Sequence, residues 1–160
     1  MRRHGQLLSE TETIEILTRG TFGVLAVSGD DSYPYTVPLS YVYRDGRIYF
    51  HCAKEGHKLD GIRRNEKVTF CVIDRDDVIQ ETFTTHFQSA TVFGKARILE
   101  NDAEKRVAIE ALIERYSPNF IPEGQKEIEK SWNSTCMVEI KIEHMTGKAA
   151  KEIIHIKNNK

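Results

Sequence analysis

The chain has 160 residues, of which 39 % are hydrophobic and 29 % charged, so it can bury the core of one globular domain and is not disordered as a whole. Its 23 basic and 24 acidic side chains leave a net charge of −1, which gives no overall electrostatic reason to bind nucleic acid or an anionic membrane. No apolar run approaches the roughly 20 residues that span a bilayer, and the N-terminal segment lacks the apolar core of a signal peptide. We therefore expect a soluble, cytoplasmic protein with a single domain over residues 1–160.

A capping box opens the first predicted element. The Ser9 hydroxyl can accept a hydrogen bond from the Glu12 amide while the Glu12 side chain reaches back, which predicts a helix over about residues 9–19. A nearly continuous apolar run at 22–27 then indicates a strand buried on both faces. After a turn cluster, apolar and polar residues alternate over 35–43, which is typical of a half-buried strand.

The middle of the chain predicts further strands and one short helix. Asp45-Gly46 is typical of a tight hairpin turn, because this pair tolerates a positive φ. Strands are expected at 48–52, 68–73 and 84–99, the last of them bent at Gly94, and a short helix is expected over 54–65.

The last third of the chain predicts two helices, one strand and a tail. Helical spacing indicates a helix over 101–116 and a weaker one over 123–132, and alternation over 136–143 indicates a strand with one solvated face. We expect a tail over about residues 152–160 that frays at its end. Strand and helix do not alternate regularly, so the pattern favours a mainly β fold in which an antiparallel sheet of five or six strands closes into a small barrel with peripheral helices.

The segment from 51 to 60 carries the strongest signal for a binding site. A strand ends and the short helix begins within it, so His57 and Lys58 fall close to the first helical turn. A cation is unfavourable there, because the helix dipole already places about half a positive charge at that end. Free amides, a lysine and a glycine that lets the backbone approach together suit a phosphate monoester. The alternative is a solvated lysine on a surface helix.

Pro38 interrupts the alternating strand. Proline cannot donate to a β-ladder, so it belongs at a sheet edge, at a bulge or beside a ligand. An interrupted ladder leaves backbone groups free to hydrogen-bond a planar heterocycle. The alternative is an edge strand without a ligand.

Other common chemistries find little support in the sequence. His51, Cys52 and His57 lack a recognised zinc-ligand spacing, so no metal site is predicted. Cys52, Cys71 and Cys136 contain no CxxC pair, and their odd number argues against a disulfide framework. The motifs of serine hydrolases and of the common nucleotide-binding loops do not occur. Basic residues are not interleaved with aromatic ones, as binders of single-stranded nucleic acid require.

Several segments resemble the FMN-binding split-barrel proteins. They are Tyr33–Tyr41, Gly46–Ala53, Glu55–Leu59, Ser89–Ala96 and Ile142–Lys148, and their order and spacing agree with that family over roughly residues 9–151. The F-H-x-A-x-x-G-x-K run that begins at Phe50 is moderately specific by itself, and the other segments strengthen it. The chain most resembles the pyridoxamine 5′-phosphate oxidase-like group that includes the nitroimidazole-resistance proteins.

The resemblance implies an antiparallel six-stranded split β-barrel that works as a homodimer with FMN at the subunit interface. The strand at 37–41 would lie along the isoalloxazine ring, residues 51–53 would flank the flavin, and His57 with Lys58 would hold the phosphate. Many relatives carry arginine or lysine in place of His57, so the charge there would depend on pH. The implied cofactor-binding residues are Val37, Pro38, Leu39, Ser40, Tyr41, His51, Cys52, Ala53, His57, Lys58, Gln88 and Ser89.

The activity that the resemblance implies is that of a flavin-dependent oxidoreductase acting on a small oxidant such as a nitro compound. His51 is the candidate catalytic proton donor or substrate contact, because imidazole transfers protons near neutral pH. The alternative is packing or a backbone hydrogen bond at the strand end. The C-terminal arginine-rich motif of true pyridoxamine phosphate oxidases is missing, so oxidation of vitamin B6 is not expected. No residue pattern forces catalysis, so a non-catalytic flavin carrier or sensor stays open, as does a haem-binding split-barrel protein.

Overall fold

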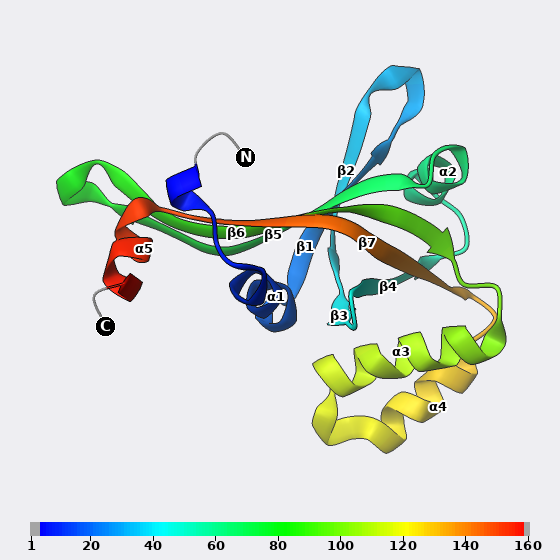
Figure 1. Cartoon of the computed structure of the whole chain (residues 1–160). Coiled ribbons are helices and arrows are strands. Elements are labelled where there is room, and N and C mark those ends of the chain that lie inside the picture. Colours follow the sequence, from blue (N-terminus) through cyan, green and yellow to red (C-terminus); the bar gives the residue numbers. More distant parts are fainter. Residues whose placement is uncertain (1–3, 159–160) are drawn as a thin grey trace.

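The computed structural model describes residues 4–158 (Figure 1). The α-helices are α1 (Glu10–Arg19), α2 (His57–Arg64), α3 (Asp102–Tyr116), α4 (Ile121–Ser131) and α5 (Lys151–Asn158). The strands are β1 (Phe22–Ser28), β2 (Pro34–Ser40), β3 (Val42–Arg44), β4 (Arg47–Ala53), β5 (Lys67–Ile79), β6 (Thr84–Ile98) and β7 (Thr135–Ala149).

The seven strands of the described chain form one antiparallel sheet in the order β2-β1-β5-β6-β7-β4-β3. Its two edge strands, β2 and β3, are consecutive in the chain and are joined by Tyr41 alone. The sheet therefore curls until its two edges meet at that residue, while the same edges stay unpaired elsewhere (Figure 1). This confirms the predicted antiparallel split β-barrel, with seven strands in place of six.

Tyr41 accounts for the additional strand. The alternation over 35–43 predicted one continuous strand, but the chain turns the Tyr41 side chain fully into the core. Its ring packs edge-on against Phe70, with 4.9 Å between centroids, and its hydroxyl donates to the carbonyl oxygen of Leu17 at 2.7 Å. The residues before it pair with β1 and those after it pair with β4, so the expected strand divides in two.

Strand β7 is covered on both faces where it leaves the helical hairpin. Val138 packs in the main core inside the barrel, whereas its neighbour Met137 packs in a second core with Leu112 and other residues of α3 and α4. The prediction of one solvated face is therefore wrong for 136–140, where every side chain is buried. The alternation in the sequence reflected two different cores, with Glu139 as the polar member held by ion pairs to Arg97 and Arg47.

Strands β5 and β6 extend beyond the barrel as a two-stranded arm. The expected strand at 68–73 continues to Ile79, and pairing runs to the end of the arm, where Ile79 faces Thr84. Residues 75–78 are exposed, and the arm tolerates the charged side chains among them because its backbone groups bond across the ladder. The tail expected over 152–160 is helical to Asn158, and residues 159–160 lie outside the described chain. This helix, α5, lies beside the arm (Figure 1).

Two local predictions are confirmed. The amide of Glu12 donates to the Ser9 hydroxyl at 3.2 Å, and the Ser9 amide donates to the Glu12 carboxylate at 2.8 Å, which is the capping box of α1. The β6–β7 register shifts between Phe93 and Gly94, where a side chain on Gly94 would collide with the Lys141 carbonyl. Among the described residues, no helix is long and apolar enough to cross a membrane.

Candidate functional site

Helix α2 begins without a side-chain cap. Its N-cap is Gly56, with φ 136°, a conformation that side-chain-bearing residues rarely adopt, and His57 and Lys58 are the first two helical residues. The amide of Leu59 donates to the Gly56 carbonyl at 2.9 Å and is the first amide with an acceptor in the helix. The amides of His57 and Lys58 precede it and have no acceptor within the helix. Lys58 is half-buried and His57 is exposed. The predicted position of His57 and Lys58 at the first turn of this helix is confirmed.

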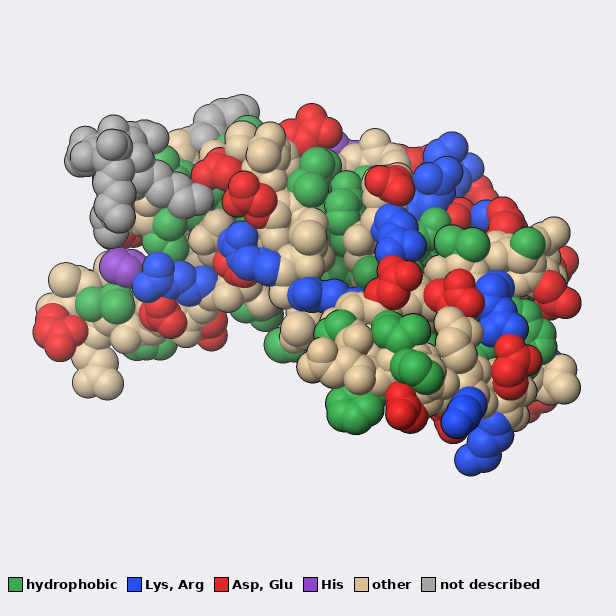
Figure 2. Space-filling model, turned by 90° about the horizontal axis from the view of Figure 1, so that it is seen from below, with side chains coloured by type: hydrophobic (Ala, Val, Ile, Leu, Met, Phe, Trp, Pro, Cys, Tyr) green, Lys and Arg blue, Asp and Glu red, His purple; other side chains and the backbone are tan. Residues whose placement is uncertain are grey.

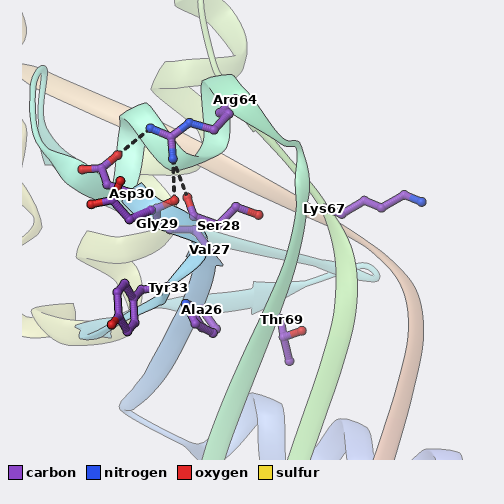
Figure 3. A pocket seen from close by; sticks show the side chains of 11 residues that line it. Ala26, Val27, Ser28, Gly29, Asp30, Tyr33, Arg64, Lys67 and Thr69 are labelled. Atoms are coloured by element: carbon purple, nitrogen blue, oxygen red, sulfur yellow. Dashed lines mark hydrogen bonds and ion pairs between the residues drawn. The ribbon is translucent and has the colours of Figure 1, made fainter.

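An ion-pair cluster lies next to this turn. The His57 Nδ1 atom is 3.6 Å from a carboxylate oxygen of Asp30, and Arg64 at the other end of α2 contacts the same carboxylate at 2.6 Å. Arg64 also donates to the Gly29 carbonyl oxygen at 2.6 Å (Figure 3). The hydrogen bond from Arg64 holds the pKa of Asp30 below its usual value. Arg64 therefore neutralises the carboxylate that lies beside His57.

Strand β2 presents a free edge. It pairs with β1 along its whole length, with Pro38 opposite Val24, and has no strand on its other side. Of the three places expected for Pro38, the structure shows the sheet edge. Side chains at 36, 38 and 40 are exposed, whereas Val37 and Leu39 pack against the main core.

Strand β4 directs its predicted site residues to two faces. His51 and Ala53 are exposed, whereas Cys52 points to the opposite face and packs against the main core. Only backbone atoms of Cys52 can therefore share a ligand with the His51 side chain.

A surface cleft of about 810 Å³ separates the α3–α4 hairpin from the barrel. Ser40 and His51 line its barrel side, so it brings together one predicted residue from β2 and one from β4. The helical side is largely apolar, and its described charged lining consists of Glu123 and Glu127, without lysine or arginine. Figure 2 shows side chains of both charges interspersed on the face that carries the hairpin. The cleft suits a small molecule that carries no negative charge.

Gln88 and Ser89 lie far from the predicted residues of β4. They pair with Ala149 and Lys148 near the C-terminal end of β7, whereas Cys52 pairs with Cys136 near its start. A strand rises about 3.3 Å per residue, so the two ends of this strand are on the order of 40 Å apart if it is straight. One molecule of FMN is too short to contact both the β4 residues and the Gln88–Ser89 pair of the same chain. Gln88 is also buried, whereas Ser89 is half-buried.

Tyr116, at the end of α3, is a residue that the sequence did not single out. Its hydroxyl accepts from the Tyr41 amide at 2.9 Å and can donate to the Tyr41 carbonyl oxygen at 2.6 Å. The helical hairpin is thereby fastened to the residue at which the sheet edges meet. No sequence signal marks a contact between residues so far apart.

No metal site is evident in the part of the chain that the structure describes, because it contains no group of three or more His, Cys, Asp or Glu side chains placed to hold an ion.

Solved structures with the same fold come from several bacteria. A putative 5-nitroimidazole antibiotic resistance protein from Bacteroides thetaiotaomicron matches with a TM-score of 0.75 and 19 % identity, over 89 % of this chain and 86 % of that one. An FAD-binding protein from Mesorhizobium loti matches with a TM-score of 0.64 and 25 % identity, over 91 % and 97 %. An FAD and haem binding protein from Mycobacterium smegmatis matches with a TM-score of 0.75 and 18 % identity, over 92 % and 74 %.

The family relationship is also visible in the sequence. No curated protein matches the chain. The family model described as pyridoxamine 5′-phosphate oxidase matches residues 9–149, which is nearly the whole chain. This match confirms the family resemblance drawn from the sequence segments above. The chain belongs to the pyridoxamine 5′-phosphate oxidase family.

Proposed function

We propose that this protein binds FMN and acts as a flavin-dependent oxidoreductase on a small oxidant such as a nitro compound. Three findings support the proposal: the family, the FAD-binding neighbour and the nitroimidazole-resistance neighbour. The observation that carries it is the uncapped first turn of α2 with His57 and Lys58.

The first turn of α2 fits the phosphate of FMN. Free amides and the helix dipole attract an anion there, and Lys58 adds a full positive charge. Asp30 would oppose an anion, but Arg64 already pairs with its carboxylate at 2.6 Å. His57 would add a second cation when protonated.

The isoalloxazine ring would lie along the free edge of β2. The backbone groups on that edge have no strand partner and can hydrogen-bond the polar edge of a planar ring. Residues 37–40 would provide these groups, whereas the amide and the carbonyl oxygen of Tyr41 already contact the Tyr116 hydroxyl. The exposed side chains of His51 and Ala53 would flank the ring from β4.

Gln88 and Ser89 would complete the site from a second copy of the chain. Their distance from β4 excludes contact with the same flavin within one subunit. A homodimer with FMN at its interface would allow residues from both places to contact the same flavin. We expect the protein to be dimeric in light scattering. Ser89→Arg, which places a bulky charge at this half-buried position, should weaken both the dimer and FMN binding. A monomer that binds FMN with full affinity would contradict this arrangement.

When bound, FMN supplies the electron transfer, and the protein supplies position, hydrogen bonds and exclusion of water. The cleft beneath the α3–α4 hairpin would admit the oxidant next to Ser40 and His51. The His51 side chain would hold a proton at its ring nitrogen and donate it to the reduced substrate.

The test begins with the chromophore. Purified protein should be yellow, and denaturation should release FMN, identified by mass and absorbance. Protein reduced anaerobically with dithionite and mixed with a nitro compound should recover its flavin absorbance in one turnover, more slowly in His51→Gln than in wild type. Colourless protein that does not take up added FMN would refute the assignment.

Two other functions give different outcomes in the same experiment. A carrier or sensor would release FMN on denaturation but leave nitro compounds unreduced. The FAD and haem binding neighbour favours a test for haem. A Soret band after reconstitution, with no uptake of flavin, would assign the chain to haem binding.

A further inference from the structure

Two of the cysteines lie directly opposite each other across strands β4 and β7. The antiparallel register pairs Cys52 with Cys136, one step before the ladder ends at Ala53 and Thr135. Residues opposite each other in such a ladder have Cα atoms about 4.5 or 5.5 Å apart. Both values lie within the range of roughly 4.4–6.8 Å that disulfides require. The backbone therefore already has the spacing of a disulfide.

The two side chains also lie on the same face of the sheet. Cys136 belongs to the main core and Cys52 packs against that core. Cys136 is 8 % exposed and Cys52 is half-buried, and both thiols are free. Cys71, the third cysteine, lies on β5, where its sulfur is 4.0 Å from the Thr91 hydroxyl.

A surface cleft reaches one member of this pair. A cleft of about 480 Å³ reaches Cys136, and Lys54, Arg63 and Lys105 line it together with the acidic Glu100 and Asp102. The surplus of one positive charge favours an anionic small disulfide over a cationic one.

We propose that Cys52 and Cys136 form a redox-active dithiol that closes to a disulfide by exchange with a small disulfide such as glutathione disulfide. The Cys52 thiolate, the more exposed of the two, attacks one sulfur of the small disulfide, which forms a mixed disulfide and releases one thiolate. The Cys136 thiolate then attacks the Cys52 sulfur, forms the internal bond and releases the second thiolate. The two released thiolates take up the protons of the two cysteines. One dithiol is thereby oxidised and one small disulfide is reduced to two thiols.

The surroundings set the rate and the consequence of this exchange. Burial and the neighbouring Cys136 raise the pKa of Cys52 to about 11, although Lys58 and Arg63 act in the opposite direction. Closure is therefore slow at neutral pH and faster in mild alkali. The bond would fasten the end of β4, which leads into the first turn of α2, to the start of β7. Because it closes a long loop, we expect it to raise the unfolding midpoint by on the order of 10 °C.

Incubation of the full chain with glutathione disulfide at pH 8.5 tests the proposal. Free thiols should fall from three to one, and peptide mapping should identify Cys52 joined to Cys136. Cys71→Ser is the matched control and should still form the bond. In Cys52→Ser and in Cys136→Ala, the remaining cysteine of the pair should stay a free thiol or carry a glutathione adduct. Dithiothreitol should restore the original thiol number and unfolding midpoint.

Three outcomes would overturn the proposal. They are a dithiol that stays reduced, a glutathione adduct that persists on Cys52 of the wild type, and a bond that includes Cys71. Peptide mapping of the unaltered chain decides among them, so the result does not depend on whether a variant folds. It also does not require bound flavin, and is thus independent of the proposed function.

Discussion

Replacement of Lys58 by alanine tests the phosphate site most directly. The side chain is half-buried in the first turn of α2, so its ammonium would meet a phosphate in partly desolvated surroundings. A hydrogen bond to a charged group contributes about 1.5–3 kcal/mol, which corresponds to a roughly 10- to 150-fold rise in the Kd of FMN. In the absence of a ligand, the same substitution should stabilise the protein. A cation at a helix N-terminus is unfavourable by about 0.3–1 kcal/mol, so the variant should unfold at slightly higher urea concentration than the wild type.

The assay compares FMN with riboflavin, which lacks the phosphate. Quenching of flavin fluorescence gives the Kd of each ligand, and Lys58→Ala should weaken FMN binding while leaving riboflavin binding unchanged. The control is Arg63→Ala, which removes the same charge from the last turn of the same helix, where Arg63 pairs with Asp60 at 3.1 Å. It should change the Kd of FMN and of riboflavin much less than Lys58→Ala changes the Kd of FMN. Equal losses for both flavins, or equal losses in both variants, would refute a phosphate contact at Lys58.

Three further predictions concern particular contacts. Tyr116→Phe leaves the Tyr41 amide without its acceptor at 2.9 Å, and should lower the free energy of unfolding by about 1–3 kcal/mol in urea titrations; a change below about 0.3 kcal/mol would show that water replaces the hydroxyl. Gly94→Ala brings a methyl group against the Lys141 carbonyl and should cost about 1–3 kcal/mol by the same measurement, whereas unchanged stability would mean that the bulge moves freely. The pKa of Cys52 is raised from 9.0 to about 11, so iodoacetamide at pH 8 should alkylate it roughly 100-fold more slowly than an ordinary exposed cysteine, with the rate rising tenfold per pH unit up to that pKa; a rate that levels off near pH 9 would contradict the raised value.

Features that depend on local spacing could be predicted from the sequence. The capping box at Ser9, the position of His57 and Lys58 at the start of a short helix, and the bend at Gly94 each depend on residues within a few positions of one another. Each is present in the structure, although the helix begins at His57 and not at 54 as expected. The mainly β antiparallel fold followed for the same reason, since period-two alternation and short turns are local signals. The family resemblance then identified the barrel type.

Features that depend on long-range pairing could not be predicted in this way. The buried Tyr41 side chain resembles any other member of an alternating strand until Leu17 and Phe70 are placed around it. The pairing of Cys52 with Cys136 depends on the register of β4 against β7, which no spacing within either strand reveals. The ion pair between Arg64 and Asp30 likewise joins two elements far apart in the sequence.

The division of the sheet at Tyr41 creates the conditions for a ligand site. Because β2 and β3 meet there and belong to opposite edges of the sheet, each leaves one row of backbone groups without a strand partner. Water can satisfy such groups, but a planar ring that satisfies them and packs against apolar neighbours adds buried area. If FMN occupies this edge, it binds the folded chain alone and must stabilise it, by about 2.7 kcal/mol at a free concentration 100 times its Kd. Riboflavin at the same multiple of its own Kd must stabilise the chain equally, because the gain in free energy of unfolding depends only on the ratio of free ligand concentration to Kd. A flavin that binds without shifting the unfolding midpoint would therefore bind elsewhere than at this folded edge.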